Sequence, residues 1–129
     1  MLYQAQHRQP IPVHLGAERS WCWIGDTVRG MRQTIEQTGG GIFNIGRDDA
    51  PVSMLQVAEM ACELTGAPMS LIEEVAAPER QTIVKRLSTA KLRSLGWKPE
   101  VELREGMERT LSWVRELEAV TQRSVGVCV

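Results

Sequence analysis

The sequence predicts a small mixed domain, of α/β or α+β type, in which short strands alternate irregularly with about four helices. Three stretches place apolar residues at helical spacing, and shorter runs of bulky or β-branched residues lie between glycines and prolines. A length of 129 residues, 43% hydrophobic and 24% charged, suits one domain with a buried core. We place this domain at residues 1–120 and treat the weakly patterned residues 121–129 as a loose tail.

The first third of the chain predicts strand, strand, helix and strand. Strands are expected at residues 11–15, 21–24 and 42–45, the last one buried, and a helix is expected at residues 26–37 before the glycines at 39–41. Apolar residues share one face of this helix, namely Val28, Met31 and Ile35. Polar residues are expected to face water, namely Arg29, Arg32, Gln33 and Glu36.

The second helix has the clearest local signals. Ser53 at its N-cap and Gln56 three residues later form a capping box, with Val52 and Val57 at the positions of a hydrophobic staple. Gly66 follows as a left-handed stop. Its apolar face consists of Met54, Val57, Ala58, Ala61 and Leu64.

The last third predicts a strand, a polar loop and two helices. The strand covers residues 70–75 and the loop residues 78–86. Ser88 is expected to cap a short helix that ends at Gly96. The final helix runs from about Leu103 to Leu117, with an i,i+4 pair of Glu105 and Arg109. Gly106 inside it costs up to ~1 kcal/mol relative to alanine.

Charge, hydropathy and cysteine usage exclude several classes of function. A net charge of −1 gives no electrostatic footprint for DNA or RNA. No apolar run approaches the ~20 residues of a membrane span, and the N-terminus is too polar for a signal peptide. Three cysteines, Cys22, Cys62 and Cys128, show no metal-ligand spacing. We expect free thiols in a reducing cytoplasm and no metal site.

Five motifs in register resemble one known family. They are residues 19–26 (RSWCWIGD), 44–46 (NIG), 53–58 (SMLQVA), 63–66 (ELTG) and 91–99 (KLRSLGWKP). Together they are similar to the carboxyl-terminal, substrate-binding domain of the NAD-dependent nucleotide-sugar epimerases and dehydratases, which are extended short-chain dehydrogenases/reductases. The resemblance covers roughly residues 8–117 and implies a domain without the Rossmann half of that family.

The catalytic parts of the family are missing from the sequence. Its glycine-rich turn, which brings backbone against a pyrophosphate, has no counterpart, because Gly39–Gly41 follows a helix rather than a strand. Its catalytic tyrosine precedes a lysine by four residues, yet the sole tyrosine here is Tyr3, with His7 four residues on. We therefore expect this chain by itself to bind no NAD and to catalyse no reaction, although the parent family does both.

The resemblance implies a site for a nucleotide-sugar diphosphate. In the family an arginine at the position of Arg19 reaches the diphosphate, which suits a guanidinium fork. A second cation comes from Arg80, Lys85 or Arg86, and the alternative for these is a solvated surface charge. Ser88 replaces a family aspartate, and the loop at residues 14–18 is short, which could move Arg19 out of register.

Other reactive residues favour structural roles. We expect His7 and His14 at the surface and Cys22 packed as an inert thiol on the strand at 21–24. Glu73 and Glu74 are expected to be solvated, since adjacent strand residues point to opposite faces. The four tryptophans suit core or interdomain packing better than a stacking platform for a base; they are Trp21, Trp23, Trp97 and Trp113.

The main alternative belongs to a different class of function. The domain could have lost its ligand and become a self-associating module, or it could be a remnant or half of a split enzyme. A homodimer is the expected form when no Rossmann partner covers the apolar surface. Candidate residues for that surface are Trp21, Trp23, Ile24, Met31 and Trp113.

Overall fold

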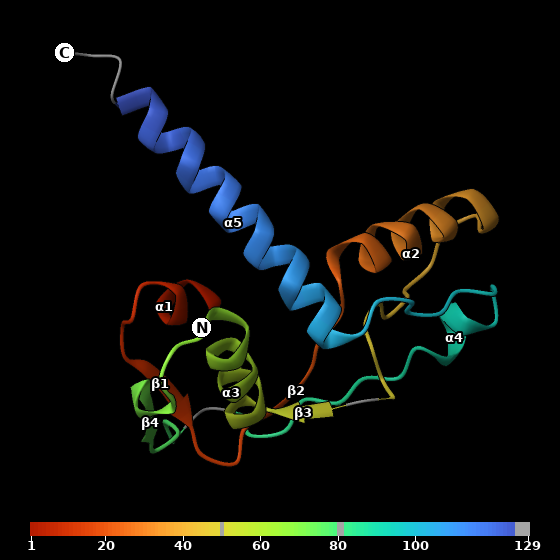
Figure 1. The fold of residues 1–129 in the computed structure, drawn as a ribbon. Helices are drawn as coiled ribbons and strands as arrows, with labels where there is room; N and C mark the ends of the chain where they lie inside the picture. The colour runs from red at the N-terminus through yellow and green to blue at the C-terminus, as the bar shows by residue number, and fades with distance from the viewer. Residues whose placement is uncertain (50, 80–81, 126–129) are drawn as a thin grey trace.

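The computed structural model describes residues 1–49, 51–79 and 82–125, and it confirms a mixed α/β fold (Figure 1). In chain order the elements are α1 (Leu2–Gln6), β1 (Ile11–His14), β2 (Glu18–Ser20), α2 (Ile24–Gln37), β3 (Pro51–Ser53), α3 (Met54–Thr65), the 3-10 turn η1 (Met69–Leu71), β4 (Ile72–Val75), α4 (Ala90–Arg93) and α5 (Leu103–Val125). Among these described residues, no helix is long and apolar enough to cross a membrane.

The strands form two separate pairs. β1 lies parallel to β4, in register from Ile11 opposite Ile72 to His14 opposite Val75. β2 lies antiparallel to β3, and a parallel bridge joins Glu18 to Val84. The bridge places the segment around Val84 beside β2, at the edge of the candidate site.

The main core lies between α1, α3, the strand pair β1–β4 and the beginning of α5 (Figure 1). The α3 helix supplies more of it than any other element, as its sequence pattern predicts. The capping box of Ser53 and Gln56 is present, and Gly66 adopts the left-handed conformation with φ of 63°. The buried residues are Ala5, Ile11, Val13, Val57, Ala58, Ala61, Cys62, Ala67 and Met107.

A second packed region lies beneath α2, around Trp97. The indole of Trp97 is 2% exposed, and its Nε1 donates to the carbonyl oxygen of Asp26 at 3.0 Å. The Asp26 carboxylate accepts from the backbone N–H groups of Glu100 and Val101, each at 3.0 Å, and pairs with Arg29 at 2.9 Å. This aspartate in the first turn of α2 therefore ties the helix to the segment before α5.

The orientation of α2 differs from the simple amphipathic expectation. Asp26 and Gly30 are its buried residues, whereas Val28, Met31 and Ile35 are all more than half exposed. Two polar residues expected in water contact the protein instead. Arg29 pairs with Glu100 at 2.6 Å, and Gln33 donates to the carbonyl oxygen of Leu95.

The strands expected at 21–24 and 42–45 do not form. β2 ends at Ser20 opposite Pro51, and proline has no N–H to extend the ladder; α2 already begins at Ile24. Ile42 is 88% exposed rather than buried, because no strand of the described chain lies beside residues 42–45. Side-chain contacts hold this loop, with the Lys91 ammonium donating to the carbonyl oxygen of Ile42.

Three other boundaries move. The strand expected at 70–75 begins at Ile72, after η1. Thr89, not Ser88, is the N-cap of α4, although the Ser88 hydroxyl accepts from the N–H of Ala90 at 3.4 Å. The last helix runs on to Val125 rather than ending near Leu117, and residues 126–129 lie outside the described chain.

Candidate functional site

Arg19 lies in an open hollow between the end of β1, β2 and the first residue of α3. The hollow has a volume of about 400 Å³ and is lined by His14, Arg19, Ser20, Trp21 and Met54. β2 ends at Ser20, and Trp21 follows it directly. Three consecutive residues, Arg19, Ser20 and Trp21, therefore line the hollow. Short antiparallel pairing therefore places one guanidinium and one indole in the same hollow.

The guanidinium of Arg19 is fixed at one end. Its Nη1 donates to the carbonyl oxygens of Glu18 and Ile83, both at 2.7 Å. These two bonds anchor the half-buried side chain to β2 and to the segment that follows residue 82. A guanidinium has five N–H donors, so the group retains capacity for a bidentate contact with phosphate oxygens.

A second cation lies near this hollow. Arg86 forms an ion pair with the carboxylate of Glu18 at 3.7 Å, and the bridge between Glu18 and Val84 holds its segment in place. Arg19 and Arg86 thus share Glu18 as a neighbour, one through the backbone and the other through the side chain. Lys85 is exposed beside Arg86, whereas Arg80 lies outside the described residues.

His14 was expected at the surface but is half-buried at the end of β1. Its Nδ1 is enclosed and has no hydrogen-bond partner within the described chain. His7 is exposed, as expected, and its Nε2 lies 2.7 Å from the Glu118 carboxylate. Sequence reasoning had no signal for His14 in the hollow, because its placement depends on the pairing of β1 with β4.

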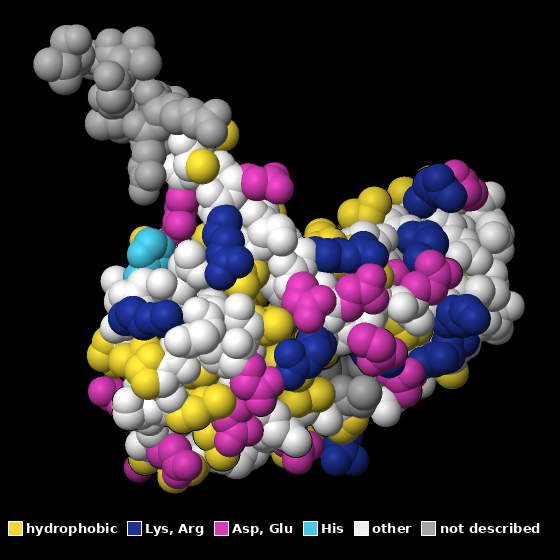
Figure 2. All heavy atoms as spheres, viewed as in Figure 1, with side chains coloured by type: hydrophobic (Ala, Val, Ile, Leu, Met, Phe, Trp, Pro, Cys, Tyr) yellow, Lys and Arg dark blue, Asp and Glu magenta, His cyan; other side chains and the backbone are white. Residues whose placement is uncertain are grey.

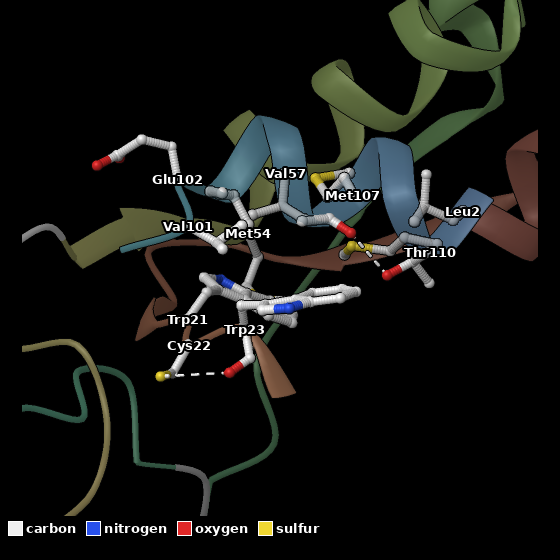
Figure 3. Close-up of a pocket in the computed structure, with 13 residues that line it drawn as sticks. Leu2, Trp21, Cys22, Trp23, Met54, Val57, Val101, Glu102, Met107 and Thr110 are labelled. Atoms are coloured by element: carbon white, nitrogen blue, oxygen red, sulfur yellow. Dashed lines mark hydrogen bonds between the residues drawn. The ribbon is translucent and has the colours of Figure 1, made fainter. Parts of the chain in front are cut away.

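An apolar cavity of about 330 Å³ adjoins the hollow and shares Trp21 and Met54 with it (Figure 3). The side chains of Trp21 and Trp23 form one wall, with Met54, Val57 and Met107 opposite them in Figure 3. The other lining residues are Met1, Leu2, Cys22, Val101, Glu102, Leu103, Gly106 and Thr110. The site therefore combines the hollow that contains Arg19 with an apolar cavity.

Gly106 of α5 has a packing role in this wall. A Cβ at that position would lie 3.3 Å from the Trp23 ring, so the glycine lets the indole approach the helix backbone. The guanidinium carbon of Arg109, almost one turn further along α5, lies 5.6 Å from the Trp23 ring centroid. The tryptophans, expected in core or interdomain packing, differ in their burial. Trp97 is in the core, while Trp113 is 61% exposed.

Ser88 does not line the hollow; it precedes Thr89, which forms a structural clamp with Asp48 and Arg93. Asp48 accepts from the backbone N–H of the next residue, Thr89, at 2.8 Å and from its hydroxyl at 2.6 Å. Arg93 of α4 pairs with the same carboxylate at 2.6 Å. These contacts, with the threonine bonds contributing most, hold the pKa of Asp48 well below its usual range.

The remaining reactive groups suggest no chemistry. Cys22 lines the cavity outside any strand, and its Sγ accepts from the hydroxyl of Thr27 at 3.5 Å. Burial raises the pKa of the Cys62 thiol, which favours the inert protonated form. Cys128 lies outside the described residues, among which no cluster of three or more His, Cys, Asp or Glu could hold a metal ion. Glu73 and Glu74 are both exposed on β4, as expected.

The fold is similar to parts of larger solved proteins. An epimerase from Methanothermobacter thermautotrophicus matches 95% of this chain at 29% identity with a TM-score of 0.77, over 38% of its own chain. The UDP-glucose 4-epimerase of Thermotoga maritima, whose structure contains UDP-glucose, matches 90% of this chain with a TM-score of 0.81. At 21% identity, over 38% of its own chain, the second likeness shows the fold alone.

Sequence comparison points the same way. The UDP-glucuronate 4-epimerase of Thermodesulfobacterium geofontis is 30% identical over 100 residues, which is 76% of this chain and 30% of that protein. The chain thus spans about a third of the length of this relative. No model of a protein family matches the chain.

Proposed function

Because this chain belongs to the extended short-chain dehydrogenases/reductases, the family of the NAD-dependent nucleotide-sugar epimerases and dehydratases, we propose that it is a nucleotide-sugar-binding domain. The observation that supports this proposal best is the guanidinium of Arg19, held by two carbonyl oxygens at 2.7 Å in a hollow walled by Trp21. An anchored guanidinium is suited to a diphosphate, which it binds through paired N–H donors.

The second cation in this proposal is Arg86, with Lys85 beside it. The ion pair of Arg86 with Glu18 at 3.7 Å is exposed and loose, so the side chain can exchange the carboxylate for a phosphate at little cost. Arg80 remains a further candidate from the sequence. We infer that the hollow binds the diphosphate and that the adjoining apolar cavity does not contact the polar part of the ligand.

The proposed domain acts on no substrate by itself. Its sequence contains neither the glycine-rich turn for NAD nor a tyrosine with a lysine four residues later. In this proposal a separate dinucleotide-binding domain supplies NAD and the reacting groups, and this chain positions the nucleotide sugar. We further propose that the chain works in the cytoplasm, where reducing conditions keep its cysteines as thiols.

The test is a titration followed by NMR. UDP-, GDP- and dTDP-sugars at millimolar concentration should shift the amide signals of residues 18–21 and 83–86. The variant Arg19→Gln should lose at least tenfold in affinity. A matched control is Arg32→Gln on α2, whose side chain is 73% exposed and does not line the hollow. Binding that is indifferent to Arg19→Gln, or equally weakened by Arg32→Gln, contradicts the proposal.

The alternative function, a self-associating module, is favoured by one observation. The apolar face of α2 is in water, with Ile24, Val28, Met31 and Ile35 between 53% and 78% exposed. Soluble monomers rarely expose a contiguous patch of this kind. The two functions are compatible, because the exposed face of α2 lies on a different element from the Arg19 hollow.

A further inference from the structure

A histidine that the proposed function leaves unused lies in the same hollow as Arg19. His14 is the last residue of β1, and its side chain lines the hollow. The chain turns towards β2 at Gly16, whose φ of 70° is in the left-handed region. Ala17 fixes this turn, because its N–H donates to the carbonyl oxygen of His14 at 3.3 Å and its own carbonyl oxygen accepts from the N–H of Met54 at 2.8 Å. The short turn therefore holds His14 and Arg19 at one site.

The two ring nitrogens of His14 differ in their surroundings. Nδ1 is enclosed and has no hydrogen-bond partner among the described residues. The ring can therefore make a polar contact with a molecule in the hollow only through its Nε2 edge. A neutral imidazole carries one proton, on either nitrogen. On Nδ1 that proton would be a buried donor without an acceptor, a group that folded proteins rarely contain. The proton therefore belongs on Nε2, where His14 presents an N–H donor to the hollow.

Charge alone does not attract a diphosphate to this chain. The net charge is −1, and basic and acidic side chains are interspersed over the face that Figure 2 shows. Such a surface produces no broad positive field. A bound diphosphate therefore depends on donors that are fixed in the hollow. Arg19 provides one set of them, and none of the described residues that line the hollow is acidic.

We propose that His14 is a further ligand residue of this hollow, whose Nε2–H donates to an oxygen of the diphosphate bound by Arg19. This inference rests on the proposed function. Hydrogen bonds to ionised oxygens are shorter and about twice as strong as those to neutral acceptors. The phosphate oxygens are therefore better acceptors for this donor than the carbonyl and hydroxyl oxygens of the nucleoside.

The first test is NMR of the two imidazole rings. The sequence contains only two histidines, and the variant His7→Gln assigns the signals of His14. Two-bond ¹⁵N–¹H spectra of the ligand-free chain should show His14 with its proton on Nε2, since protonated and unprotonated ring nitrogens resonate far apart. The spectra are recorded above the pH range in which imidazoles usually titrate. Inorganic pyrophosphate and UDP at millimolar concentration should then shift Nε2 together with the Arg19 Nε–H, and uridine should shift neither.

A pair of amide variants tests the contact itself. In His14→Gln the side-chain amide reaches the position of Nε2, whereas the shorter His14→Asn places its amide near the enclosed Nδ1. His14→Asn should weaken the binding of pyrophosphate and UDP roughly tenfold, as expected for a hydrogen bond to a charged group, while His14→Gln should stay within about threefold of the native chain. The matched control is His7→Asn, whose side chain is 38% exposed and does not line the hollow; it should leave binding unchanged.

The possible results separate this inference from the proposed function. A proton on Nδ1 in the ligand-free chain, or equal loss of affinity with His14→Gln and His14→Asn, would overturn the role of His14. A response of Arg19 to pyrophosphate without a shift of His14 Nε2 would overturn that role and leave the diphosphate site intact. If neither residue responds to pyrophosphate or UDP, the proposed function fails as well. The spectra of the native rings decide the question even where circular dichroism shows that a variant at position 14 does not fold.

Discussion

Replacing Asp26 by alanine should destabilise the fold more than any surface change, because this carboxylate connects α2 to the segment before α5. It is 1% exposed and accepts two backbone N–H groups, those of Glu100 and Val101, at 3.0 Å each. Arg29 supplies the countercharge at 2.9 Å. Alanine leaves both backbone donors without their acceptor and removes one of the two carboxylates that pair with Arg29, which keeps Glu100 at 2.6 Å.

The magnitude follows from the groups left unpaired. A buried donor that loses its partner costs about 1–3 kcal/mol, and a lost charge partner adds to this, so we expect about 3–5 kcal/mol for Asp26→Ala. That is a large part of the ~5–15 kcal/mol by which a domain of this kind is stable. Asp26→Asn should cost less, since its amide oxygen can still accept, although its NH₂ group then faces Arg29.

The assay is urea unfolding followed by tryptophan fluorescence. Trp97 reports on this region directly, because its Nε1 donates to the carbonyl oxygen of Asp26. The midpoint should fall while the denaturant slope stays the same. Glu36→Ala is the control: its side chain is 60% exposed, and the loss of its loose pair should cost less than about 0.5 kcal/mol. A loss below about 1 kcal/mol for Asp26→Ala would refute the reasoning.

Three further predictions concern the clamp of Asp48 and two glycines. The pKa of Asp48 is lower in the folded state than its unfolded value of about 3.9. The stability that the Asp48 carboxylate contributes is therefore complete above that unfolded pKa and is lost as the pH falls through the folded pKa. In Asp48→Asn the free energy of unfolding should fall less steeply below about pH 4, as measured by urea unfolding from pH 3 to 7. Gly30→Ala should cost about 1–3 kcal/mol, because the new methyl group lies 3.0 Å from the side chains of Ile45 and Trp97. Gly106→Ala should be neutral or stabilising by up to ~1 kcal/mol, since Trp23 borders a cavity into which it can shift; a larger loss at position 106 than at position 30, by thermal unfolding, would show that this wall is rigid.

Local signals in the sequence predict local structure well. The capping box of Ser53 and Gln56 and the left-handed Gly66 define α3 correctly because those interactions span only three or four residues. The Glu105–Arg109 pair forms at 2.6 Å for the same reason. The resemblance to the epimerase and dehydratase family was likewise predictable, because the five motifs keep their order.

Features that depend on distant partners could not be predicted in this way. The apolar run at 21–24 looks like a strand, yet its neighbour Pro51 cannot extend the ladder. The polar side of α2 turns inward because Asp26 has backbone partners more than seventy residues away. The motif makes Arg19 a candidate ligand residue, but its anchor on the carbonyl oxygen of Ile83 follows only from the bridge beside β2.

The most direct test of the central claim compares UDP with uridine as ligands of the chain. A diphosphate held by Arg19 requires that UDP shift the Arg19 side-chain Nε–H and backbone signals in NMR spectra, with Arg86 responding in parallel. Uridine at the same millimolar concentration should leave these signals in place, because it offers no phosphate to the guanidinium. Equal shifts with both compounds, or no shift with UDP, would contradict the assignment of this hollow as a diphosphate site.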